Sequence, residues 1–296
     1  LSARLAWWGT AWMRGAVVAD LDIIAAAPPL MNASGYADLI AKIPAGADWI
    51  LADALGVEKI DATSWDFVQT HLCDWCANAA GIKTGDAKAI RGLVEGLMMT
   101  GFAMQAHKSS RPASGAEHQF SHVWDMQHHT HDGAVVPHGF KVGIGSLAMT
   151  RLYEWLFEQD IANLDVDRAV EAWPADVDAA IAKAQAAYDI AEMGDKAALE
   201  VRSKYIDRAA LRQQLRKLRS VWSTLKDRLA NQLLLLVELR DRLMHAGAPT
   251  ESQQIGISSD RLNQTHWQAY YIRRRFTVLD LAVRTGLLEK YLATTN

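Results

Sequence analysis

The sequence lacks the marks of several protein classes. Two cysteines in 296 residues are too few for the disulfide scaffold of a small secreted protein. The longest apolar run, residues 233–237, is far shorter than the roughly 18 residues of a membrane-spanning helix. Lys and Arg number 31 against 34 Asp and Glu, a net charge of −3, so a chain-wide basic field for nucleic acid is absent. We therefore expect a soluble cytoplasmic protein with no membrane span and no nucleic-acid partner.

The sequence carries helical patterning over most of its length. Helices are predicted over residues 35–55, from a cap at Thr63 or Ser64 to residue 80, after the cap Asp86, and over residues 139–158, 208–245, 260–275 and 277–292. A short apolar run at residues 16–18 predicts one buried strand, after which Pro28 and Pro29 stop any regular element. The predicted fold class is all-α, with one or two strands at the N-terminus.

The most informative stretch contains two histidines four residues apart. Ser114 and Glu117 match a capping box, which places His118 and His122 in the first two turns of a new helix. Residues four apart share a helix face, so this pair can hold a metal ion, or one can hold metal while the other contacts substrate. Ten histidines in the chain make the spacing common by chance, and solvated or hydrogen-bonded histidines are the alternative.

Two further residues are candidate ligands. His138 follows Pro137 at a junction of loop and helix, where a third imidazole can complete a metal site; the alternative is an N-terminal histidine with packing glycines behind it. Asp38 offers a hard carboxylate ligand, or else an acid near a helix N-terminus that the helix dipole favours. The histidines of residues 128–131 weigh less, because nothing orients that polar loop and solvent exposure is expected.

Two other patterns favour structural roles. Cys73 and Cys76 form a C-x-x-C motif without a second cysteine pair or a thioredoxin-like pattern, so buried thiols are expected. The basic residues between 202 and 219 suggest RNA, but their interleaved leucines are typical of a solvated helix face.

Several segments, in this order, carry a family resemblance. They are VVADLDIIAAAPPLMNASGYADLIAK at residues 17–42, SRPASGAEHQFSH at 110–122, PHGFKVGIGSL at 137–147, AGAPTESQQIGIS at 246–258 and RRRFTVLDLAVRTGLLEKYL at 273–292. Together they resemble sn-glycerol-1-phosphate dehydrogenases of the iron-type alcohol dehydrogenase and dehydroquinate synthase superfamily. The resemblance spans roughly residues 16–296, and residues 1–15 do not match it.

The resemblance implies a fold, a reaction and roles for residues. Residues 16–296 correspond to the helical metal- and substrate-binding domain. Asp38, His118 and His138 match the metal ligands, with Zn²⁺, Ni²⁺ or Fe²⁺ as the ion. His122 matches a substrate-contacting residue, and Asp38 also touches substrate. The implied reaction is the reduction of dihydroxyacetone phosphate to sn-glycerol 1-phosphate by NADH or NADPH, a step of phospholipid metabolism.

The sequence also departs from this family. The NAD- or NADP-binding half would precede Ala16, and no Gly-rich turn after a strand is present to cradle a pyrophosphate. We therefore expect a truncated chain without cofactor-binding residues or activity of its own. The surface that would pack against the missing half should be an apolar patch, which predicts self-association. A homo-oligomer is one possible form of this self-association. The alternatives are a glycerol or other alcohol dehydrogenase of the superfamily, or a non-catalytic helical module that binds a metal or a partner.

Overall fold

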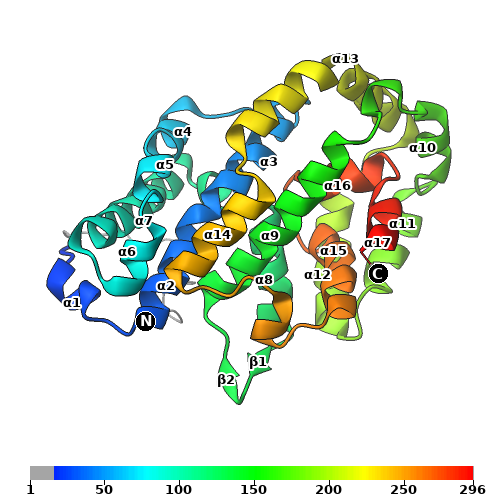
Figure 1. Cartoon of the computed structure of the whole chain (residues 1–296). Helices are drawn as coiled ribbons and strands as arrows, with labels where there is room; N and C mark the ends of the chain where they lie inside the picture. The colour runs from blue at the N-terminus through cyan, green and yellow to red at the C-terminus, as the bar shows by residue number, and fades with distance from the viewer. Residues whose placement is uncertain (1–16, 296) are drawn as a thin grey trace.

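The computed structural model describes residues 17–295, which are built almost entirely of helices (Figure 1). The helices are α1 (Leu21–Ala25), α2 (Pro29–Ile40), α3 (Lys42–Ala54), α4 (Ala62–Gln69), α5 (Leu72–Trp75), α6 (Ala79–Thr84), α7 (Ala87–His107), α8 (Ala116–Met126), α9 (His138–Phe157), α10 (Val166–Ala172), α11 (Val177–Gln185), α12 (Ala191–Lys204), α13 (Arg208–Gln232), α14 (Leu236–Ala246), α15 (Ser259–Tyr271), α16 (Val278–Arg284) and α17 (Leu288–Thr294). Short 3₁₀ turns lie at Arg111–Ala113, Ile161–Asn163 and Ser252–Ile255. The predicted all-α class is confirmed.

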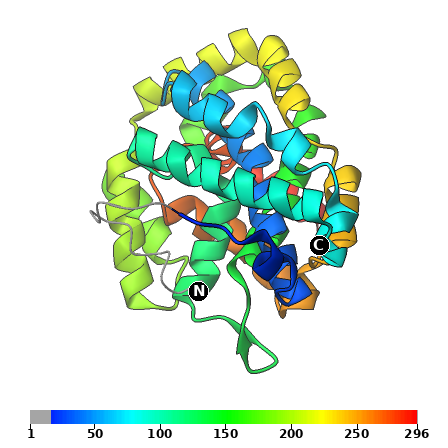
Figure 2. The same cartoon turned by 90° about the vertical axis from the view of Figure 1, so that its left-hand side faces the viewer.

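The strands lie in a different place from the predicted one. β1 (Thr130–His131) and β2 (Ala134–Val135) pair antiparallel in the loop between α8 and α9, and this hairpin projects from the helical body in both views (Figures 1 and 2). The buried strand expected at residues 16–18 is wrong for its described part, because Val18 is 89% exposed and residues 17–20 pair with no strand. The Asp20 carboxylate instead accepts the backbone N–H groups of Asp22 and Ile23 and starts α1. Residues 1–15, predicted to be unmatched, lie outside the described residues.

Prolines set the ends of the first long helices. Pro29 opens α2 at its first position, where a missing N–H costs nothing; the expectation that it stops regular structure is wrong. The single helix predicted over residues 35–55 is two helices that meet at Ala41. Pro44 has no N–H to donate to the carbonyl of Ile40, so an unbroken helix loses a hydrogen bond here and a new first turn accommodates the proline.

Capping side chains divide the next segment. Three polar residues act as caps: Asp61 accepts from the N–H of Ser64, Asn78 from that of Gly81, and Asp86 from that of Ala89. The prediction of Asp86 is confirmed, whereas the helix expected from Thr63 or Ser64 to residue 80 is three short helices, α4 to α6. Each cap satisfies orphan donors and lets a helix begin without continuity with the one before.

The helix predicted over residues 208–245 also divides. Its buried stripe is confirmed, and the stripe consists of Leu211, Leu215, Leu218, Trp222, Leu225 and Leu229. Residues 233–235 are extended between α13 and α14. The Glu154 carboxylate of α9 accepts the Leu236 N–H at 2.7 Å and caps α14, and Gly247 ends α14 at a φ of 84°. Leucines at helical spacing continue across residues 233–235, so the sequence pattern does not predict the break. The contact with Glu154 on another helix accounts for it.

The packing brings four helices together. α8 and α9 are neighbours across the hairpin loop, α2 packs against α9, and α15 packs against α8. Figure 2 shows α7 passing across the front of the chain's blue N-terminal helices, where it packs against α2, α4 and α6. No helix within residues 17–295 is both long and apolar enough to span a bilayer.

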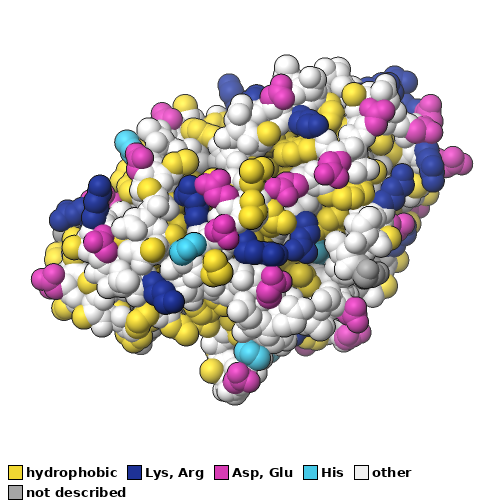
Figure 3. Space-filling view, in the orientation of Figure 1, with side chains coloured by type: hydrophobic (Ala, Val, Ile, Leu, Met, Phe, Trp, Pro, Cys, Tyr) yellow, Lys and Arg dark blue, Asp and Glu magenta, His cyan; other side chains and the backbone are white. Residues whose placement is uncertain are grey.

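Some apolar side chains stay exposed. Leu235, Val237 and Met244 are 65%, 62% and 52% exposed on and beside α14. Figure 3 shows apolar side chains gathered on the same face of the molecule. Self-association through such a surface stays a prediction, which light scattering tests.

Candidate metal centre

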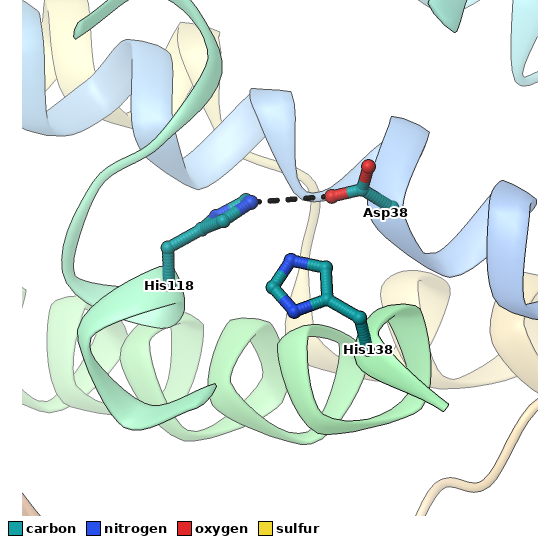
Figure 4. Close-up of side chains that lie close together, drawn as sticks. All are labelled: Asp38, His118 and His138. Carbon is teal, nitrogen blue, oxygen red and sulfur yellow. Dashed lines mark ion pairs between the residues drawn. The ribbon is translucent and has the colours of Figure 1, made fainter. Parts of the chain in front are cut away.

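Three potential ligands converge from three helices. Asp38 lies on α2, His118 on the first turn of α8, and His138 is the first residue of α9. One ligand atom of each lies within 4.8 Å of the others, and the His118 Nε2 to Asp38 Oδ1 distance is 3.2 Å. Figure 4 shows the three side chains pointing toward a common space. The structure thus brings together the three residues that the sequence singled out as ligands.

A close approach of backbones makes this convergence possible. A Cβ atom on Gly139 would lie 1.8 Å from the Ser34 carbonyl oxygen, which no side chain tolerates. Glycine therefore lets α9 begin directly against α2, with His138 beside the last turn of α2, where Asp38 sits. Because α2 starts at Pro29, Asp38 is far from that helix's N-terminus, and the alternative of an acid stabilised there by the helix dipole is wrong.

His118 is oriented by the residue before it. The Glu117 side chain is fully buried, and its Oε1 lies 2.8 Å from His118 Nδ1 and 2.7 Å from the Gly115 N–H. A carboxylate only accepts, so Nδ1 donates to Glu117, and the ring is held with Nε2 3.2 Å from Asp38 Oδ1. Metal-binding histidines are typically held in this way by a second acidic group.

The capping box predicted here is wrong in one partner. Gly115 is the cap of α8, and the Ser114 hydroxyl instead accepts from Arg275 at 2.7 Å. Glu117 does reach back to a backbone N–H, but to that of Gly115. A Cβ on Gly115 would meet Asp48 Oδ2 at 2.5 Å, so the small residue lets a second carboxylate come close.

His138 has its own orienting group. Its Nδ1 lies 3.0 Å from the Ser121 hydroxyl and 3.7 Å from Asp125 Oδ2. Asp125 is also paired with Lys141. Burial alone would raise the pKa of Asp125, but bonds from His138 and Lys141 lower it well below its usual range. An ionised Asp125 holds the Nδ1 side of His138, which leaves Nε2 for the cluster.

Asp38 is held as an anion. Lys42, one turn along, places Nζ 2.8 Å from Asp38 Oδ1 and 2.7 Å from the Asp38 carbonyl oxygen. Burial would raise the pKa of Asp38, yet Lys42 and the two imidazoles hold it well below the ordinary value. The site therefore offers one anionic oxygen and two imidazole nitrogens, a donor set suited to Zn²⁺ and similar ions.

His122 lies one turn beyond His118 and contacts the cluster from the side. Its ring centroid is 6.5 Å from that of His138, and its Nε2 accepts from the Arg273 guanidinium at 3.0 Å. Burial and the Arg273 charge lower the pKa of His122 to about 2, so it is neutral with its proton on Nδ1. Arg273 was missed by sequence reasoning; its only signal was the run of three arginines at residues 273–275.

Other sequence candidates fall outside the cluster. His129 is buried with Nε2 2.6 Å from the Ile255 carbonyl oxygen, so the solvent exposure expected of it is wrong. Cys76 is buried but Cys73 is exposed, which corrects half of that expectation. A cavity of about 1040 Å³ lies elsewhere, lined by residues such as Trp173, Lys204 and Tyr270.

Comparison with known proteins agrees with the motifs. No protein-family model matches the chain. It is 35% identical over 148 residues to the glycerol-1-phosphate dehydrogenase (NAD(P)+) of Bacillus subtilis strain 168, over 50% of this chain and 38% of that protein. Proteins of the same name match at 39% over 139 residues in Korarchaeum cryptofilum, covering 46% of this chain and 44% of theirs, and at 39% over 140 residues in Pyrococcus horikoshii, covering 47% and 39%. The match spans less than half the length of these relatives. The resemblance is thereby confirmed: over about half of its length, this chain is similar to glycerol-1-phosphate dehydrogenases.

Proposed function

We propose that this chain provides the metal- and substrate-binding part of a dehydrogenase that reduces dihydroxyacetone phosphate to sn-glycerol 1-phosphate with NADH or NADPH. The observation that carries the proposal is the convergence of Asp38, His118 and His138, with each imidazole held through Nδ1 on the side away from the common space. The names of the similar proteins support the substrate and the cofactor.

The donor set fits a divalent ion. Asp38 Oδ1, His118 Nε2 and His138 Nε2 are the atoms that would hold Zn²⁺, Ni²⁺ or Fe²⁺. When bound, such an ion polarises a carbonyl oxygen as a Lewis acid and stabilises the developing alkoxide. Three protein ligands leave a position open for that oxygen, as in catalytic rather than structural sites.

His122 is proposed as a substrate contact. Because Arg273 occupies its Nε2 as a donor, His122 presents the Nδ1 proton, and it can donate a hydrogen bond to a substrate oxygen. Its low pKa means that it acts as a neutral donor that orients the substrate and not as a cationic acid.

The nicotinamide cofactor is proposed to bind outside the residues described. Residues 17–295 contain one sheet of two antiparallel two-residue strands, and a pyrophosphate cradle of the dinucleotide type needs a strand, a glycine-rich turn and a helix. We assign metal and substrate binding to the described residues, and in this proposal hydride transfer requires a nucleotide-binding partner segment.

The second candidate is a non-catalytic helical module that binds a metal or a partner. It is favoured by one observation: Asp38 Oδ1 is bonded by both Lys42 and His118, so the cluster is satisfied as a network of ion pairs. A nucleotide-binding half supplied in trans separates the two. Restored NADH-dependent reduction of dihydroxyacetone phosphate rules out the module.

The first test is metal content by inductively coupled plasma mass spectrometry after loading with Zn²⁺. We expect about one ion per chain in the wild type and none in a His118→Ala, His138→Ala double variant, because removal of two of three ligands abolishes tetrahedral coordination. A matched control replaces two exposed histidines, His128→Ala and His245→Ala, and keeps the ion. Zinc retained by the His118, His138 variant, or absent from the wild type, overturns the proposal.

A further inference from the structure

Three consecutive arginines, in the segment between α15 and α16, have three different environments. Arg274 is exposed and forms hydrogen bonds of 2.9 and 3.3 Å with the Glu200 carboxylate. Arg275 is half-buried and donates to the Ser110 hydroxyl and to the carbonyl and hydroxyl oxygens of Ser114. Arg273 is half-buried and donates to His122 Nε2. Arg275 therefore ties the loop before α8 in place, whereas Arg273 reaches the substrate-contacting histidine.

Arg273 is a cation without a carboxylate partner. Within residues 17–295, no Asp or Glu oxygen lies within 4.0 Å of its guanidinium, and the one hydrogen bond that the guanidinium makes there is to His122. The neighbouring acid, Glu200, is engaged by Arg274. Burial lowers the pKa of Arg273, and the charge of Glu200 opposes this shift only in part.

The surroundings of Arg273 suit an anion. It lines a hollow of about 570 Å³ together with Lys196, Arg274 and Arg275. The two acids that line the same hollow, Glu58 and Glu200, are engaged by Arg111 at 3.3 Å and by Arg274. The basic side chains there outnumber the acidic ones, and Arg273 also bonds His122, whose ring centroid lies 6.5 Å from that of His138.

We propose that Arg273 binds the phosphate group of the three-carbon substrate and so selects a phosphorylated substrate over glycerol or a simple alcohol. The inference rests on the proposed function and deepens it. In dihydroxyacetone phosphate, a single CH₂–O link separates the phosphate from the carbonyl carbon, so a phosphate-binding group must sit next to the residues that hold the carbonyl. Arg273 occupies such a position, because its guanidinium donates to His122 beside the metal centre. A guanidinium has five donors in a planar fork that matches phosphate oxygens, and four of them remain for the ligand.

The test measures binding of sn-glycerol 1-phosphate and of glycerol to the Zn²⁺-loaded chain by isothermal titration calorimetry. We expect Arg273→Gln to weaken binding of sn-glycerol 1-phosphate roughly 10–100-fold, the range of a charge-assisted hydrogen-bonded pair, and to leave zinc content and glycerol binding unchanged. Arg273→Lys keeps the charge but not the fork, so we expect an intermediate loss. Arg202→Gln, on an exposed arginine that pairs with Asp178 and does not line this hollow, is the matched control and should bind as the wild type does.

The outcomes separate this proposal from the function on which it rests. Equal effects of Arg273→Gln and Arg202→Gln, or a wild type that binds zinc but not sn-glycerol 1-phosphate, overturn the role of Arg273. If the wild type binds no zinc, and Arg273→Gln nevertheless weakens the binding of sn-glycerol 1-phosphate, the metal site is refuted and the anion site is supported. NADPH is the other source of phosphate chemistry; a larger effect of Arg273→Gln on NADPH than on sn-glycerol 1-phosphate reassigns the anion to the cofactor and overturns the proposal.

Discussion

Replacement of Glu117 by glutamine tests whether the second acidic group prepares His118 for a metal ion. The glutamine oxygen still accepts from the Gly115 N–H and His118 Nδ1, which now lie 2.7 and 2.8 Å from Glu117 Oε1. Only the negative charge is lost. A neutral acceptor binds roughly half as strongly as a charged one, so the imidazole becomes less basic and less firmly oriented.

The expected magnitude follows from the type of contact. Loss of such an outer group typically weakens metal affinity about 10–100-fold, which corresponds to about 1.4–2.7 kcal/mol. The metal-free protein should not pay a similar cost. Burial and the Glu117 charge raise the pKa of Asp48 to about 7, so Glu117→Gln relieves a repulsion. Glu117 Oε2 and Asp48 Oδ2 both approach the same point above Gly115, at 2.8 and 2.5 Å, so the new amide finds a carboxylate acceptor nearby.

The assay is a competition titration of Zn²⁺ against a chelator, paired with thermal unfolding of the metal-free chain. Glu117→Gln should lower the zinc affinity while the melting temperature of the metal-free chain stays constant or rises. Glu95→Gln, on an exposed residue of α7 paired weakly with Arg91 at 4.0 Å, controls for a change of net charge. Unchanged zinc affinity in a correctly folded Glu117→Gln chain refutes the reasoning.

Three further predictions concern stability. Burial lowers the pKa of His266 to about 4, below its unfolded value of about 6.5, so the unfolded chain binds more protons between these values and the folded chain loses stability as pH falls. From pH 7.5 to 5 the loss is about 2 kcal/mol. Phenylalanine cannot be protonated, so urea unfolding of His266→Phe should show a loss of stability in acid that is smaller by that amount. Gly139→Ala forces a Cβ against the Ser34 carbonyl, so it should lower the free energy of unfolding by about 1–3 kcal/mol and also lower the zinc affinity. Gly101→Ala places its Cβ where no atom lies within 4 Å, so it should be neutral or stabilising. Equal unfolding midpoints for the two variants contradict this. Leu218→Ala empties a site that is 1% exposed on α13 and should cost about 2–5 kcal/mol with zinc content unchanged, and a parallel loss of zinc would show that the centre depends on α13.

The sequence predicts those site residues whose positions depend on their neighbours along the chain. Residues four apart share a helix face, so His118 and His122 were paired correctly from spacing. A residue after a proline at a loop end is well placed for a ligand, and His138 is such a residue. Arg273 obeys no such rule, because its contact with His122 spans 151 residues and depends on how α15 packs against α8.

The fold divides in the same way. Helix content and the buried stripe of α13 follow from periodicity, and the cap at Asp86 follows from its chemistry. The break at residues 233–235 could not be predicted, because Glu154 creates it from another helix while the leucine pattern continues across it. The strand expected at residues 16–18 failed for a related reason: an apolar run becomes a strand only with a partner strand beside it, and residues 17–20 have none.

The positions of the three ligands along the chain have a consequence for folding. His118 and His138 are 20 residues apart on two neighbouring helices, whereas Asp38 and His118 are 80 apart. Closing the longer loop costs about 1.2 kcal/mol more chain entropy, so the two imidazoles meet first, in the α8–α9 pair, and Asp38 arrives when α2 docks. Metal binding to this local histidine pair stabilises the folding chain before the rest of it has folded. Zinc present during refolding should therefore accelerate formation of this helix pair, and the carboxylate closes the site last.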